Sequence, residues 1–153
     1  MGDTYTQLFV QIVFAVRGRV NFIGKEHREL VHRHVTAVMQ NDGHKMLSVF
    51  CMPDHIHFLA GLNPAQSISD MVLDVKRAST NMLNEKGLFN GHFNWQKGFG
   101  AFSHSKSQVP DVINYILNQE AHHQQKTFRQ EYHEFLDKFG IAYKEEYLFE
   151  FYE

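Results

Sequence analysis

The sequence predicts an α+β fold in which an antiparallel sheet carries helices on one face. Short apolar runs with a period of two alternate with longer runs of helical period, in the order strand, helix, strand, strand, helix, strand. This order is typical of a ferredoxin-like (RRM-like) split βαβ sandwich. More helical sequence follows the last strand, so C-terminal helices are expected in addition to the sandwich.

The limits of the segments come from turn and capping residues. Pro53-Asp54 makes a turn, because proline has no N–H to donate to a sheet. Ser67 with Asp70, and Thr127 with Gln130, have the spacing of capping boxes that begin helices. The predicted segments are strands at 8–16, 46–52, 55–62 and 99–105, and helices at 25–40, 68–85, from Pro110 onward, and 128–139.

The composition fits one globular domain. The chain has 153 residues, of which 43% are apolar and 21% charged. A net charge of −2 excludes the global basic field that supports non-specific nucleic-acid binding, so cationic contacts to DNA must be local. The lone Cys51 lies in an apolar run and is expected to be buried and reduced. With neither a signal peptide nor a membrane-length apolar run in sight, a cytoplasmic protein without a membrane partner is expected.

Two histidines follow the Pro53-Asp54 turn. In a strand, alternate residues point to the same face and lie about 6 to 7 Å apart, so His55 and His57 could bind one ion. Ile56 and Phe58 would point to the other face, into the core. The alternative is that the pair arises by chance, because the chain has 11 histidines. A metal site therefore needs further ligands.

The helix opened by Pro110 carries a second polar group. Tyr115 and Gln119 are four residues apart, so they lie on one face of a continuous helix, on a flank that also includes His122. The alternative is a half-buried packing tyrosine beside a solvated glutamine. The core-facing residues expected in this helix are Val112, Ile113, Ile116 and Leu117.

Three segments in order resemble the signatures of the insertion-sequence 200/605 transposases, the single-tyrosine members of the HUH superfamily. These segments are Pro53–Leu59, Trp95–Ser103 and Tyr115–Glu120. The similarity continues through residues 122–132 and so covers nearly the whole chain. The resemblance implies that residues 1–153 form a single transposase domain.

The resemblance also implies roles for single residues. His55 and His57 match the paired metal-binding histidines, Tyr115 matches the nucleophile, and Gln119 matches the third metal ligand. Such enzymes cut single-stranded DNA at element ends with hairpins and rejoin it through a 5′-phosphotyrosine link, without nucleotide hydrolysis. They act as homodimers in which the nucleophile helix can complete the partner's active site. An oxygen-rich ligand shell favours Mg²⁺ or Mn²⁺.

Contacts to DNA are expected from local basic groups. The candidates are Arg17, Arg19, Lys76, Arg77 and Lys97. Each is as readily explained as a solvated surface charge. Trp95 and Phe99 could stack on unpaired bases, although such residues more often pack in a core.

Two alternatives belong to other functional classes. One is a non-catalytic or domesticated nucleic-acid-binding relative on the same fold. The other is a small-molecule metalloenzyme that uses the His-x-His pair, although Phe58-Leu59 stand where a binuclear hydrolase would carry Asp and His. The acidic, aromatic tail at 145–153 is unlike a DNA-binding surface and is expected to pack on the body or on a dimer mate.

Overall fold

The computed structural model describes residues 2–152, and within them four strands form one antiparallel sheet. The strands are β1 (Phe9–Ala15), β2 (Lys45–Cys51), β3 (His55–Gly61) and β4 (Gly100–His104). Their order across the sheet is β2-β3-β1-β4, and all neighbours pair antiparallel. The ferredoxin-like split βαβ prediction is confirmed.

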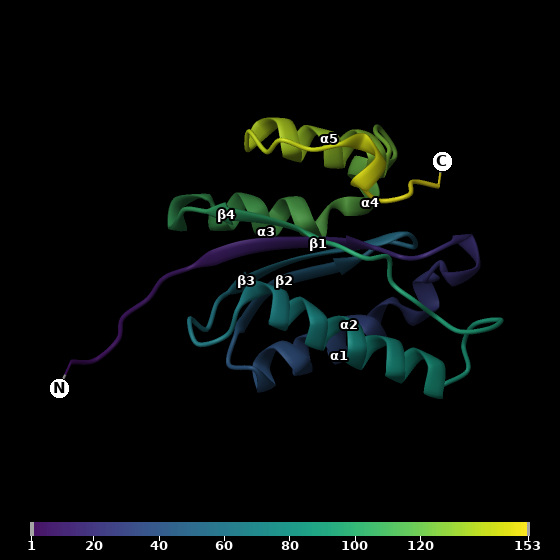
Figure 1. Cartoon of the computed structure of the whole chain (residues 1–153), viewed down its shortest axis with the longest axis horizontal. Coiled ribbons are helices and arrows are strands. Elements are labelled where there is room, and N and C mark those ends of the chain that lie inside the picture. Colours follow the sequence, from purple (N-terminus) through teal and green to yellow (C-terminus); the bar gives the residue numbers. More distant parts are fainter. Residues whose placement is uncertain (1, 153) are drawn as a thin grey trace.

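Two helices cover one face of this sheet, α1 (Lys25–Asn41) and α2 (Ile68–Glu85) (Figure 1). The strand residues that alternate with the histidines point toward these helices, so the predicted division of β3 into a polar and a packing face is confirmed. The core between the layers contains buried side chains from both helices and from the strands: Ile12, Phe14, Ile56, Phe58, Val31, Val35, Met39, Met71, Val75 and Leu83.

The C-terminal helices lie on the opposite face of the sheet (Figure 1). They are α3 (Val109–Leu117), α4 (Gln119–His123) and α5 (Phe128–Lys138). Both halves of the predicted Thr127–Gln130 capping box form at the start of α5. Short 3-10 turns, η1 (Arg19–Asn21), η2 (Lys106–Gln108) and η3 (Glu145–Tyr147), connect the larger elements.

Helix α5 packs on the sheet through aromatic rings. Phe102 of β4 stacks on Phe135 and Phe139, with ring centroids 5.2 and 5.0 Å apart. A Cβ atom at Gly100 would lie 2.8 Å from the Tyr132 hydroxyl, so glycine at this position allows α5 to approach the sheet. The approach matters because α5 reaches over the histidines of β3.

The helix from Pro110 differs from its prediction in two ways. It ends at Leu117, and Asn118 (φ −100°, ψ 24°) separates it from α4, so Tyr115 and Gln119 lie on different helices. Ile116 is fully buried as predicted, but Leu117 is 52% exposed, so the expectation that it faces the core is wrong. As the last residue of α3, Leu117 instead borders a surface hollow beside Arg28 and Phe50.

The tail packs on the body, which is one of its two expected positions. Phe149 is buried against Phe128 and Tyr132 of α5. The Gln96 side-chain amide makes two hydrogen bonds, of 2.8 and 2.7 Å, with the backbone of Glu150. The tail therefore connects α5 to the segment before β4.

Cys51, at the end of β2, is buried as predicted. Burial raises the pKa of its thiol to about 12, so the thiol stays protonated and unreactive at neutral pH. Within residues 2–152, none of the helices combines the length and apolar character that crossing a bilayer requires.

Candidate metal and nucleophile site

Strand β3 places His55 and His57 side by side on the face covered by α3, α4 and α5. Their ring centroids are 5.0 Å apart, and both side chains are fully buried. The His55 ring also stacks on Phe128 of α5, with centroids 3.9 Å apart and planes almost parallel. The histidine pair is thus held between the sheet and α5.

Glu131 of α5 completes a group of three ligating side chains. Its Oε1 atom lies 2.9 Å from His57 Nε2 and 3.8 Å from His55 Nε2. One ligand atom from each of these three residues lies within 4.8 Å of the others, and all three side chains are buried. Such a set of two imidazoles and a carboxylate could bind a divalent cation.

Glu131 was not among the site residues expected from the sequence, although a signal was present. It follows Phe128 by three residues and precedes Phe135 by four, so it belongs to the apolar stripe of α5. A carboxylate in an apolar stripe requires a buried partner, because an unpaired buried charge is costly. Its partners come from β3, far away in the sequence, which the pattern of α5 could not reveal.

Gln119, the expected third ligand, also reaches the histidines. It is the first residue of α4 and is fully buried. Its Oε1 atom lies 3.4 Å from His55 Nε2 and 3.1 Å from His123 Nε2. His123 Nε2 in turn lies 3.3 Å from Glu131 Oε1, so a third imidazole borders the cluster.

The second nitrogen of each paired histidine has its own partner. His55 Nδ1 donates to Asp54 Oδ1 at 2.7 Å, which holds the ring with Nε2 directed at the cluster. Gln11 Nε2 donates to His57 Nδ1 at 3.3 Å, and Gln11 Oε1 accepts from His104 Nε2 at 3.0 Å. If the Gln11 amide rotated by half a turn, its oxygen would face His57 Nδ1 and accept a hydrogen bond from it. The His57 proton would then be on Nδ1, and Nε2 could bind a metal ion.

The charge states of these groups fit a cation. Burial lowers the pKa of His57, which favours its neutral form. Burial alone would raise the pKa of Glu131, but His57 and His123 outweigh burial and hold it far below its ordinary value. Neutral imidazole and ionised carboxylate are the forms that bind metal ions, so the residues present fit a divalent metal.

Tyr115 lies at the same carboxylate. Its hydroxyl donates a hydrogen bond to Glu131 Oε2, and its ring stacks on His122 with centroids 4.4 Å apart. Burial and the charge of Glu131 raise the pKa of the phenol, so it carries its proton in this arrangement. Within a single chain, the structure brings together His55, His57, Tyr115 and Gln119, the four residues predicted as metal ligands and nucleophile.

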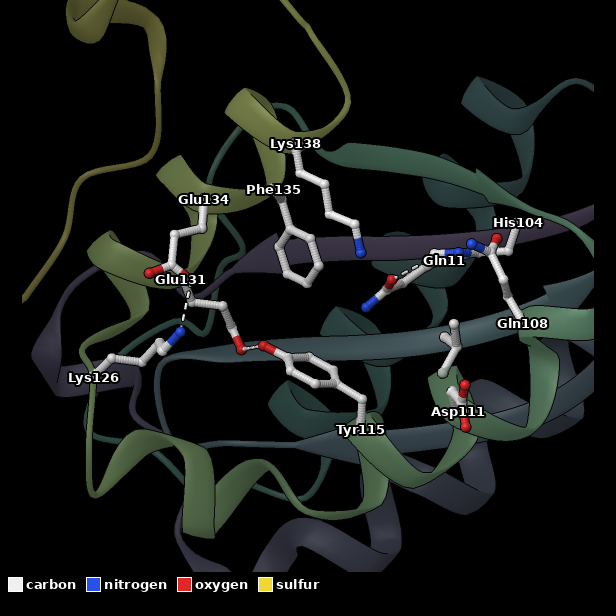
Figure 2. A pocket seen from close by; sticks show the side chains of 11 residues that line it. Gln11, His104, Gln108, Asp111, Tyr115, Lys126, Glu131, Glu134, Phe135 and Lys138 are labelled. Atoms are coloured by element: carbon white, nitrogen blue, oxygen red, sulfur yellow. Dashed lines mark hydrogen bonds and ion pairs between the residues drawn. The ribbon is translucent and has the colours of Figure 1, made fainter.

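A cavity of about 350 Å³ opens beside the Tyr115 hydroxyl (Figure 2). Phe135 and Lys138 extend into it from α5, while Tyr115 and Asp111 border it from α3. Gln11 forms part of its wall and connects it to His57. The cavity therefore reaches Glu131, at the edge of the buried cluster.

The predicted DNA contacts do not all lie near this site. Lys76 and Arg77 belong to α2, on the opposite face of the sheet. Lys76 Nζ donates to the carbonyl oxygens of Gln96 and Gly98 at 2.9 and 2.7 Å, and burial lowers its pKa to about 8. Lys76 is therefore a structural cation in this chain, engaged by the loop before β4.

The remaining basic candidates are exposed near the end of β1 at which His55 pairs with Ala15. They are Arg17, Arg19 and Lys97. The Arg17 backbone donates to the Asn94 carbonyl at 3.0 Å, which keeps the segment after β1 beside the loop that carries Lys97. Trp95, one of the two predicted base-stacking residues, is instead buried in the core, where its Nε1 donates to Ser79.

Comparisons with known proteins agree with the fold and the motifs. A solved structure described as that of a transposase from Deinococcus radiodurans R1 is similar over 78% of this chain and 96% of its own, with a TM-score of 0.60 and 21% identity. A REP-associated tyrosine transposase bound to a REP hairpin is similar over 80% of this chain and 73% of its own, with a TM-score of 0.60 and 13% identity. A comparison with curated proteins gave no match.

The sequence model of the family described as "Transposase IS200 like" matches residues 4–119. The match includes the histidine pair of β3, the tyrosine of α3 and the first residue of α4, and it covers most of the chain. The chain therefore belongs to the IS200-like transposase family.

Proposed function

We propose that this transposase cuts and rejoins single-stranded DNA by metal-assisted transesterification, with Tyr115 as nucleophile. The observation that carries the proposal is the convergence on Glu131. Its Oε1 atom faces the histidine pair, while its Oε2 atom accepts the Tyr115 hydrogen bond. A nucleophile and a cation-binding group thus meet at one carboxylate.

The proposed ligands of the ion are His55, His57, Gln119 and Glu131. Two imidazole nitrogens, an amide oxygen and a carboxylate oxygen suit Mn²⁺ or Mg²⁺, and Mn²⁺ tolerates nitrogen ligands better than Mg²⁺ does. A bound divalent ion would withdraw charge from the phosphate and so make its phosphorus more electrophilic.

The reaction of the chain's own residues can be written in full. Tyr115 Oη attacks the phosphorus and passes its proton to Glu131 Oε2, the atom that already accepts its hydrogen bond. The transfer accompanies bond formation, because the new bond to phosphorus makes the phenol oxygen acidic enough to protonate a carboxylate of low pKa. The bond from phosphorus to the 3′ oxygen breaks, and that oxygen takes a proton from water to become a 3′-hydroxyl, while Glu131 returns the tyrosine proton to the solvent. A later attack by a 3′-hydroxyl on the 5′-phosphotyrosine link reverses these steps and joins DNA in a new connection.

Access to the cluster requires movement. The proposed ligands are buried, and the Tyr115 hydroxyl is engaged with Glu131. DNA would enter by the cavity beside Tyr115, and the Tyr115–Glu131 hydrogen bond would open as the phosphate arrives. The break at Asn118 gives α3 a joint at which it could move separately from α4.

The proposed partner is single-stranded DNA with hairpin ends, a proposal supported by the hairpin-bound relative. Arg17, Arg19 and Lys97 are the proposed contacts to the DNA backbone, because they lie exposed at the His55 end of the sheet.

We further propose a homodimer in which Tyr115 serves its own or its partner's histidine pair. Mixing Tyr115→Phe with His57→Ala protein would restore cleavage only if the tyrosine acts on the partner.

The test is to trap covalent DNA on the protein. Purified protein is incubated with labelled single strands that carry a hairpin and randomised flanks, with Mg²⁺, Mn²⁺ or EDTA. We expect metal-dependent adducts that are resistant to denaturant and are absent from Tyr115→Phe but present in Tyr147→Phe, which alters an exposed tyrosine. A pool that yields no adduct with either metal would refute the proposal.

The non-catalytic alternative has one observation in its favour, the raised pKa of Tyr115, which opposes phenolate formation. A binding protein on this fold would retain full affinity for hairpin DNA in Tyr115→Phe and would form no adduct in any variant. The same experiment therefore separates the two functions.

A further inference from the structure

We propose that the cavity beside Tyr115 is a subsite for the nucleotide immediately 3′ of the cut, the nucleotide whose 5′-phosphate is transferred to the tyrosine. This inference rests on the proposed function. The volume of the cavity, about 350 Å³, falls in the range of small-ligand sites. Because the cavity contains Tyr115 in its wall, a nucleotide joined to that tyrosine would extend directly into it.

The walls of the cavity divide by chemistry. Val112 and the rings of Tyr115 and Phe135 form an apolar surface, and the two rings meet edge to face with centroids 5.9 Å apart. Aromatic and aliphatic surfaces of this kind pack against a sugar or base without regard to sequence. The apolar part therefore suits the nucleoside.

The charged groups give the nucleotide an orientation. Figure 2 places Lys138 of α5 and Asp111 of α3 on opposite walls. Lys126 is already paired with Glu134 at 2.6 Å, so Lys138 is the lining cation available to attract the next phosphate along the strand. The Asp111 carboxylate repels phosphate and accepts hydrogen bonds from base amino groups, so the base would face α3.

Other occupants fit less well. A free anion would gain only the Lys138 ammonium and would lie beside Asp111 and Glu131, because Lys126 is already paired with Glu134. A wholly apolar ligand would offer no polar partner to the charged groups of Lys138 and Asp111 in the wall. A nucleotide carries both kinds of group, with its phosphates and base separated by the sugar.

Binding can be measured apart from cleavage. The probes are the four 2′-deoxynucleoside 3′,5′-bisphosphates and inorganic phosphate, added to methyl-labelled protein with EDTA present. We expect the bisphosphates to shift the Val112 methyl signals in a saturable manner, while inorganic phosphate leaves them unchanged. Lys138→Gln should weaken bisphosphate binding about two- to fivefold, as expected for a partly exposed charge contact. Lys86→Gln, a change at an exposed residue just after α2, should have no effect.

A filling variant provides the second arm. Val112→Phe should block the cavity and abolish bisphosphate binding measured by calorimetry, whereas Leu73→Phe, which places the same ring on the exposed face of α2, should not. Thermal unfolding of both variants checks that they fold. In the adduct assay, Val112→Phe should slow adduct formation at least about tenfold while Leu73→Phe does not.

The outcomes separate the two proposals. Bisphosphate binding without any adduct would leave the subsite in place and refute the transposition chemistry. Adducts that form equally well in folded Val112→Phe, or methyl signals that respond to none of the bisphosphates, would overturn the subsite and leave the proposed function intact. An equal response to inorganic phosphate would mean anion binding alone and would also overturn it.

Discussion

Tyr115 donates its hydroxyl hydrogen to Glu131 Oε2, and the other oxygen of the same carboxylate lies 2.9 Å from His57 Nε2. The carboxylate therefore links the proposed nucleophile on α3 to the histidine pair on β3. Neither contact is local in sequence, so the site depends on how α5 is seated on the sheet.

Replacing Glu131 with Gln should weaken metal binding and adduct formation together. The variant keeps the size of the side chain but removes the charge that faces His57 and the proton acceptor of Tyr115. We expect Mn²⁺ affinity to fall at least about tenfold, as measured by calorimetry. The matched control is Glu134→Gln, which changes an exposed carboxylate three residues further along α5. An unchanged Mn²⁺ affinity in Glu131→Gln would exclude Glu131 as a ligand.

Gln11 should act on the metal through His57. Its buried amide joins His57 Nδ1 to His104 Nε2, so Gln11→Ala leaves the His57 ring without its positioning partner. Losses of about 10- to 100-fold in metal affinity are typical when such a partner is removed. Gln108→Ala, which changes another amide of the same cavity, should keep its affinity in the same Mn²⁺ titration.

Lys76 should matter for stability rather than for DNA. In Lys76→Met, two charge-assisted hydrogen bonds to the loop before β4 are lost, and the free energy of unfolding should fall by roughly 1 to 3 kcal/mol. Urea unfolding measures this, with Arg77→Met, an exposed neighbour, as the control. Reduced affinity for single-stranded DNA with unchanged stability in Lys76→Met would show that the lysine binds DNA after all.

The tail should be needed for the site as well as for stability. Phe149→Ala removes a ring buried against Phe128 and Tyr132, so we expect a loss of about 3 kcal/mol in the free energy of unfolding. Because Phe128 stacks on His55, metal affinity should fall too. Tyr147→Ala removes an exposed ring from the same segment and should change neither quantity.

The contact between His133 and Glu145 should depend on pH. The hydrogen bond to the Glu145 carboxylate raises the pKa of His133, so protonated His133 stabilises the fold fully below about pH 6.5, its ordinary pKa. This contribution is lost as the pH rises through the raised pKa, and solvent screening keeps it under about 1 kcal/mol. Urea unfolding of wild type and His133→Gln at pH 5.5 and 9 should show a difference that shrinks at the higher pH; a constant difference would contradict the assignment.

Local patterns predicted the parts of the structure that local chemistry decides. Alternation along β3 was enough to place His55 and His57 on one face and Phe58 on the other. The spacing of Thr127 and Gln130 likewise identified the start of α5, because a capping box satisfies the first free N–H groups of a helix by itself.

The features that local patterns did not reveal depend on distant partners. Glu131 finds its histidines 74 and 76 positions earlier in the chain. In the sequence Lys76 has the pattern of a surface cation, and its hydrogen bond to the Gln96 carbonyl depends on how a distant loop folds. Helix α3 ends at Asn118, where no proline or glycine indicates a helix end. The residue pattern within one segment cannot predict contacts of this kind, which form between residues far apart in the sequence.

The two hydrogen bonds between the Gln96 side chain and the backbone of Glu150 bear on the order in which parts of the site form during synthesis. Phe149 packs on α5, the helix that carries Glu131, and the Gln96–Glu150 hydrogen bonds fix the position of Phe149. A nascent chain that has left the ribosome only as far as α5 has the histidines and the tyrosine but lacks the residues that fix the carboxylate over them. We therefore expect the group of His55, His57 and Glu131 to close only after residues 149–150 have emerged from the ribosome and packed on α5.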